Sequence, residues 1–207
     1  VQKALHVTLF QIEPQEASRG EKRPLEETLR STEQLYAGLL SLLGQHETFT
    51  LEIAVAQGSE HVVFYLAVPT ARASVAERLV HSVFPDVRVE EKRGDYNLFG
   101  EDGEVSCATI SLKKHPALPF KTYETFAHDP LNLVLSAFSK LAKHKEGAAI
   151  QLVVGSAGDR YNAHYSKILK VIEGGAPLSD ALKTPETMFG DVMHDIARSV
   201  FASSKKT

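Results

Sequence analysis

Apolar residues alternate with other residues over positions 5–10, 49–55 and 62–68, and this period of two predicts three β-strands. Residues 57–60 form a short connection between the last two strands, which are therefore expected to form a hairpin. Between the first and second strands, apolar side chains recur every three or four positions from Pro24 to Leu43. That spacing predicts an amphipathic helix with its apolar stripe turned inward.

A second helix and a fourth strand follow. The helix is expected to open at Pro69-Thr70 and to end before Pro85-Asp86, and residues 87–91 read as a strand. The resulting order, β-α-β-β-α-β, is that of the split βαβ, or ferredoxin-like, arrangement. The first part of the chain therefore predicts a ferredoxin-like lobe over residues 1–95.

The second half of the chain predicts the order β-α-β-α. A strand is expected over 105–113, then a helix capped by Asp129-Pro130, a strand over 148–154 and a helix with its stripe at 161–172. The fold class is α+β, with a largely antiparallel sheet and helices packed on one face. The predicted units are residues 1–95, residues 104–178 (or one continuous domain over 1–178), and a C-terminal linker and helix over 179–207.

The composition limits which partners and which cellular compartment suit the chain. Its 207 residues are 43% hydrophobic and 24% charged with a formal net charge of −3, so any attraction to nucleic acid must come from a local patch. Cys107 is the only cysteine, which excludes an internal disulfide and a cysteine zinc cluster and favours a reducing, cytosolic compartment. Its position within an expected strand predicts a small buried side chain. Val1 and the Lys205-Lys206-Thr207 tail look like cuts, so a larger parent protein is expected.

Catalytic and metal-binding patterns are missing from the sequence. The glycine-rich turn at 155–159 lacks the lysine of a phosphate-binding loop, Asp159 suits a helix N-cap, and Ser156 misses the GxSxG pattern by one residue. The nine histidines form no HExxH pattern. We therefore assign no catalytic, cofactor-binding or metal-binding residue, and keep an enzyme of unrecognised type as an alternative.

Two sets of residues are candidates for binding. The first is an aromatic and apolar loop bounded by glycines, which could contact a protein partner or instead plug the core. The second is a set of lysines near residues 113 and 140, which would contact nucleic acid, since RNA-binding domains share the predicted element order. In that reading Tyr65 is expected opposite the core-facing Phe64. The candidates are Tyr96, Leu98 and Phe99 for a partner, and Lys113, Lys114, Lys140, Lys143 and Lys145 for nucleic acid.

Several short segments occur in an order that carries a family resemblance. They are LEIAV at 51–55, FYLAVP at 64–69, FPDVRVE at 84–90, DYNLF at 95–99, LPFKTY at 118–123, DPLN at 129–132 and EGAAIQ at 146–151. As a set they resemble the uncharacterised N-terminal region of bacterial proteins related to conjugative DNA-transfer and type IV secretion ATPases. The match covers about residues 1–178.

The resemblance implies membrane helices upstream of this region and a RecA-like motor downstream. It implies a non-catalytic cytoplasmic accessory or docking domain at the inner face of the membrane, which acts in assembly or partner contact. Its partners would be its own motor domain, a second copy or secretion-channel subunits, with nucleic-acid contact in DNA transfer as the alternative. The Walker motifs of the motor have no counterpart in these 207 residues, so no family catalytic residue is carried over.

Overall fold

The computed structural model describes residues 6–14, 25–44, 46–59, 61–93, 99, 103–122, 125–126, 130–143, 146–157 and 160–183. These residues divide into two compact units. The first, which we call the sheet unit, takes in the described residues of 6–105 and 127–156, and the second unit takes in those of 106–126 and 157–183.

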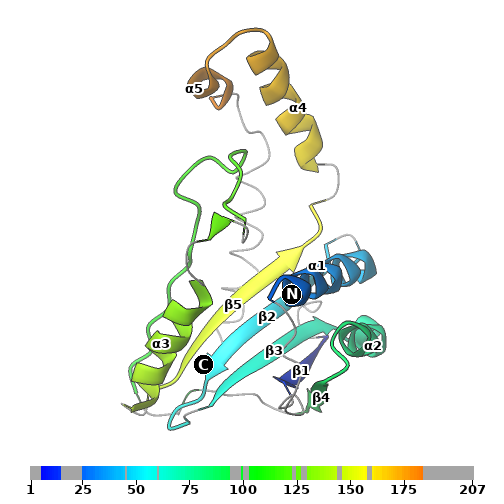
Figure 1. Ribbon diagram of the computed structural model, residues 1–207, viewed down its shortest axis with the longest axis vertical. Coiled ribbons are helices and arrows are strands. Elements are labelled where there is room, and N and C mark those ends of the chain that lie inside the picture. The colour runs from blue at the N-terminus through cyan, green and yellow to red at the C-terminus, as the bar shows by residue number, and fades with distance from the viewer. Residues whose placement is uncertain are drawn as a thin grey trace. The chain divides into compact units, whose positions relative to one another are not determined.

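The sheet unit is built on five antiparallel strands. Their order across the sheet is β4-β1-β3-β2-β5, and every neighbouring pair is antiparallel (Figure 1). This arrangement confirms the α+β class and the antiparallel sheet expected from the sequence. The strands are β1 (Val7–Pro14), β2 (Thr48–Val55), β3 (Val62–Pro69), β4 (Val87–Lys92) and β5 (Ala148–Gly155).

The helices follow the predicted positions closely. None of those in the described part of the chain is long and apolar enough to cross a membrane. In the sheet unit they are α1 (Leu25–Leu42), a short 3-10 turn η2 (Thr70–Arg72) that leads into α2 (Ala73–Val83), and α3 (Pro130–Lys143). In the second unit they are α4 (Arg160–Glu173) and α5 (Leu178–Ala181).

The main core lies between one face of the sheet and the helices α1 and α2. The predicted inward faces of β2 and β3 are confirmed, because Phe49, Leu66 and Val68 pack into this core. The helices approach closely at Gly38, where an added Cβ would lie 2.6 Å from a Leu79 methyl carbon. The buried core residues are Phe10, Leu35, Leu39, Phe49, Leu66, Val68, Ala76 and Val80.

The strand β5 lies beside β2 in the same sheet. Its register runs from Thr48 opposite Gly155 to Val55 opposite Ala148. The sheet therefore draws strands from both sides of residue 104, although the lobe boundaries at 1–95 and 104–178 stay a prediction. The helix expected near the C-terminus, after Thr184, lies outside the described residues.

The expected strand over 105–113 is wrong. Residues 104–112 form neither helix nor strand, and their apolar side chains face solvent, with Val105 78% and Ile110 89% exposed. A strand needs a neighbour for its backbone groups and a surface for its apolar face, and this segment pairs with none of the described strands. The prediction of a buried Cys107 fails with it, since the thiol is exposed.

Candidate functional site

The face of the sheet opposite α1 and α2, which we call the distal face, carries the candidate site. Successive side chains of a strand point to opposite faces. Because Leu66 and Val68 enter the main core, Tyr65 and Ala67 lie on the distal face. The strand registers extend this assignment to the other four strands.

One polar residue from each strand falls at the same level of the distal face. Gln11 stands opposite both Glu90 and Tyr65, and Glu52 stands opposite both Tyr65 and Gln151. Side chains that are directly opposite in antiparallel strands lie within contact range. We call these five residues the polar row; in sheet order they are Glu90, Gln11, Tyr65, Glu52 and Gln151.

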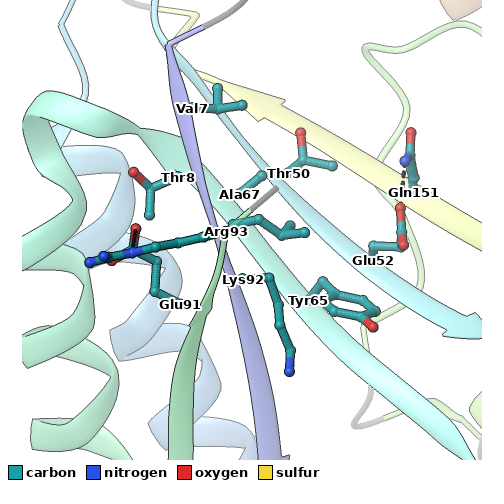
Figure 2. Close-up of a pocket in the computed structure, with 11 residues that line it drawn as sticks. Val7, Thr8, Thr50, Glu52, Tyr65, Ala67, Glu91, Lys92, Arg93 and Gln151 are labelled. Carbon is teal, nitrogen blue, oxygen red and sulfur yellow. Dashed lines mark hydrogen bonds and ion pairs between the residues drawn. The ribbon is translucent and has the colours of Figure 1, made fainter. Parts of the chain in front are cut away.

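A hollow of about 570 Å³ lies over this level of the sheet (Figure 2). It includes three members of the polar row, and its walls mix hydroxyl, amide, carboxylate and ammonium groups with short apolar side chains. Such a lining offers hydrogen bonds in several directions to a bound segment or molecule. The lining residues are Val7, Thr8, Leu9, Thr50, Glu52, Tyr65, Ala67, Glu91, Lys92, Arg93 and Gln151.

Glu52 is the buried carboxyl group of this site. Only 6% of its surface is exposed, and its Oε2 atom accepts a hydrogen bond from the Gln151 amide, as the dashed line in Figure 2 marks. Burial raises the pKa of Glu52 above its usual value, and the bond from Gln151 acts in the opposite direction. Glu52 therefore takes up a proton at a higher pH than a surface glutamate does.

Tyr65 lines the hollow beside Glu52, and its side chain is 7% exposed. Burial raises the pKa of its hydroxyl, Lys92 acts against that rise, and the carboxylates of Glu52 and Glu13 add to it. The ring belongs to a small apolar cluster on the distal face, so its stacking surface is used within the protein. That cluster contains Tyr65 and Ala54, packed against Leu9, Ala56, Val63 and Ala149.

The charged groups at the β4 side are paired. Lys92 Nζ lies 3.1 Å from Glu90 Oε1, and this contact lowers the pKa of Glu90. Arg93 Nε lies 3.2 Å from Glu91 Oε1, and Figure 2 shows the two side chains next to each other. The hollow therefore presents balanced charge, which suits recognition by hydrogen bonding rather than by a net electrostatic attraction.

The binding residues suggested by the sequence lie elsewhere or outside the described residues. Tyr96 and Leu98 lie outside the described residues, and the side chain of Phe99 is 40% exposed. Lys113 and Lys114 are exposed in the second unit, and Lys140 is exposed on α3 of the sheet unit. Lys143 ends α3, but its side chain, like the whole of Lys145, is outside the described residues. None of the three described candidates, Lys113, Lys114 and Lys140, lines the hollow.

Sequence reasoning anticipated Tyr65 on the distal face but missed its polar neighbours. The signal for Glu52 was present, because a carboxyl group in an otherwise apolar strand must find a partner or face water. Its partner Gln151 is distant in sequence, and only the register of β2 with β5 brings the two together.

Two histidines also meet unexpectedly in the second unit. The rings of His115 and His164 stack with centroids 6.3 Å apart. Across the described residues, no group of three or more histidine, cysteine, aspartate or glutamate side chains is placed to hold a metal ion.

The family of the chain follows from residues 5–166, which match the domain of unknown function DUF8128. The match spans most of the 207 residues, so the chain belongs to this family. No curated protein and no solved structure matches the chain.

Proposed function

We propose that this member of the DUF8128 family is a non-catalytic docking module that binds a segment of a protein partner over its distal face. The observation that carries the proposal is the hollow over the polar row, with hydrogen-bonding side chains contributed by all of the strands that line it. The accessible polar groups of the hollow include the Gln151 amide, the Thr8 and Thr50 hydroxyls and the Lys92 ammonium, and they match the donors and acceptors of a polypeptide.

We further infer that β1 to β4 with α1 and α2 form a ferredoxin-like unit, to which β5 adds a fifth strand. The support is the order β4-β1-β3-β2 within the sheet, together with a helix after β1 and another after β3. In this unit both helices cover one face, which leaves the other available for a partner.

A protein partner suits the distal face better than nucleic acid does. Its charged side chains include three carboxylates, Glu13, Glu52 and Glu90, against two cations, Arg88 and Lys92. Phosphate groups would meet a net negative surface there. Tyr65 is 7% exposed and offers little ring surface on which a base could stack.

The resemblance to conjugative DNA-transfer and type IV secretion ATPases suggests a setting for this docking. In that setting the module is cytoplasmic, at the inner face of the membrane, and its partner is the motor of the same protein or a neighbouring channel subunit. The full-length gene product tests the setting directly. We expect an apolar stretch of about 20 residues upstream and a GxxxxGK[ST] motif downstream. A parent protein with neither removes the ATPase setting but leaves the docking proposal intact.

Calorimetric titration of the purified chain with the motor domain of its parent protein tests the docking. Thr50→Arg inserts a long cation into the hollow, and Lys92→Glu breaks its pairing with Glu90. We expect each to weaken binding by at least about tenfold. Lys183→Glu is the matched control, since Lys183 also pairs with a carboxylate, Asp180 at 2.7 Å, outside the hollow. Equal affinity of all three variants and the unmodified chain would exclude the hollow as the docking site.

The nucleic-acid alternative rests on Lys113, Lys114 and Lys140, which are exposed. Fluorescence anisotropy with single-stranded DNA at about 50 mM salt favours detection, because phosphate contacts are strongest at low salt. We expect no saturable binding there. Saturable binding that falls when these lysines are replaced by glutamate would favour the alternative over a protein partner.

A further inference from the structure

The two outer strands of the sheet differ in how they are protected. Within the described residues, β4 pairs with β1 alone and β5 pairs with β2 alone, so each has one backbone edge without a neighbouring strand. Four of the six residues of β4 are charged: Arg88, Glu90, Glu91 and Lys92. Charged side chains on an edge strand oppose the addition of another strand. The eight residues of β5, AAIQLVVG, include no charge and no proline.

The middle of β5 is also its most open part. Ile150, Gln151 and Leu152 are exposed, whereas Ala149 before them and Val153 after them are both half-buried. Ile150 is 40% and Leu152 is 54% exposed, although both point to the face of the sheet that α1 and α2 cover further along. An uncharged strand with exposed apolar side chains and an unpaired edge is a template for another β-strand.

We propose that two copies of the chain pair antiparallel through β5, about a two-fold axis at Gln151, and join their sheets edge to edge. Directly opposite residues of antiparallel strands have their side chains on the same face. An axis at Gln151 therefore sets Ile150 of one copy opposite Leu152 of the other, twice. The two exposed apolar side chains of each copy cover those of its partner.

A second copy fits this edge for reasons of charge and symmetry. Pairing β5 with itself brings no charged side chain against another, whereas the β4 edge would offer four. The exposed stretch 150–152 is centred on Gln151, so a symmetric contact buries all of it. Such isologous contacts are the commonest way in which proteins self-associate. This pairing rests on the backbone edge of β5 and on Ile150 and Leu152, neither of which lines the hollow, and it shares only Gln151 with the docking proposal.

Sedimentation velocity of the purified chain, whose monomer mass is 22.7 kDa, tests the association. We expect a concentration-dependent dimer that Leu152→Lys disrupts, with a dissociation constant raised at least about tenfold. Leu169→Lys is the matched control, because Leu169 is 57% exposed and lies on α4, and it should leave the dimer unchanged. Thr50→Arg, in the hollow, should also leave it unchanged. A monomer at about 200 µM, or a dimer that survives Leu152→Lys, overturns the proposal.

Disulfide trapping tests the register separately. In a Cys107→Ser background, Gln151→Cys sets two thiols directly opposite each other across the axis. Opposite Cα atoms of antiparallel strands are about 4.5–5.5 Å apart, within the range of a disulfide. Val153→Cys, two residues along, should give no disulfide-linked dimer under the same oxidation, because the two thiols are offset along the paired strands. Any other pattern, including a dimer trapped only by Val153→Cys, overturns the pairing centred on Gln151.

Discussion

At the residue scale, the buried Glu52 is the feature that departs most from an ordinary sheet surface. A carboxylate buried to this degree loses hydration, and the amide of Gln151 compensates for part of that loss. The sequence alone could place Glu52 on the face opposite Leu51, because successive side chains of a β-strand point to opposite faces of the sheet. It could not predict the partner, since the hydrogen bond depends on how β2 and β5 align.

The raised pKa of Glu52 predicts a pH-dependent effect of Glu52→Gln on the free energy of unfolding. The folded protein holds a proton that the unfolded chain releases near its usual pKa of 4.5. Wild-type stability therefore falls as the pH rises from that value through the raised pKa, and Glu52→Gln removes this loss. We expect the variant to gain stability relative to wild type over that window and to keep the gain at higher pH, as measured by urea unfolding.

Glu90→Gln is the control of opposite sign. The contact with Lys92 lowers the pKa of Glu90, so wild type gains stability as Glu90 ionises and loses it as the pH falls through the lowered value. The variant should lose a little stability above that window and match wild type below it. Parallel pH profiles for Glu52→Gln and Glu90→Gln would contradict both assignments.

The exposure of Cys107 predicts that the thiol reacts in the native protein. The residue lies in the irregular segment 104–112 and is exposed. A thiol reagent such as DTNB should titrate one equivalent per chain without denaturant, at a rate close to that in urea. Cys107→Ser should change the free energy of unfolding by less than about 0.5 kcal/mol. A thiol that reacts only after unfolding would restore the buried strand that the sequence suggests.

At the element scale, the sequence predicts an element well where its pattern and its neighbours agree. The hairpin of β2 and β3 combines alternation, a short connection and partners close in sequence, and both strands form as expected. The segment 105–113 has alternation in part but acquires no partner strand, and its apolar side chains stay exposed. Strand pairing is a property of two segments, so the pattern within one segment cannot decide it.

The close approach of α1 and α2 predicts that a large side chain at Gly38 destabilises the fold. A Cβ there would lie 2.6 Å from Leu79 Cδ2, inside the distance that two carbons tolerate. We expect Gly38→Leu to cost about 1–3 kcal/mol in urea unfolding through overpacking. Leu79→Ala in the same chain should recover part of that cost, since it vacates the space. A double variant whose losses simply add would show that the two helices do not meet at this point.

At the scale of the whole molecule, the order of strands in the sheet is what creates the site. The polar row needs β4 and β5 at opposite edges and the three other strands between them in register. The sequence predicts all five strands, but apart from the short connection between β2 and β3 it gives no means of aligning them. Because the hollow depends on that alignment, the sequence does not predict it. The sequence does predict that β2 and β3 turn their apolar faces to one core.

The same strand order predicts how hydrogen exchange varies over the molecule. The strand β3 lies between β1 and β2, and its residues Leu66 and Val68 are buried in the main core, so its amides open only with the whole sheet. Residues 104–112 have no strand or helix to protect them. Exchange monitored by mass spectrometry should therefore be slowest in β3 and fastest in peptides from 104–112, by at least about a thousandfold in rate. Protection of 104–112 that matches β3 would mean that this segment is part of a sheet after all, and that the edge of the fold lies elsewhere.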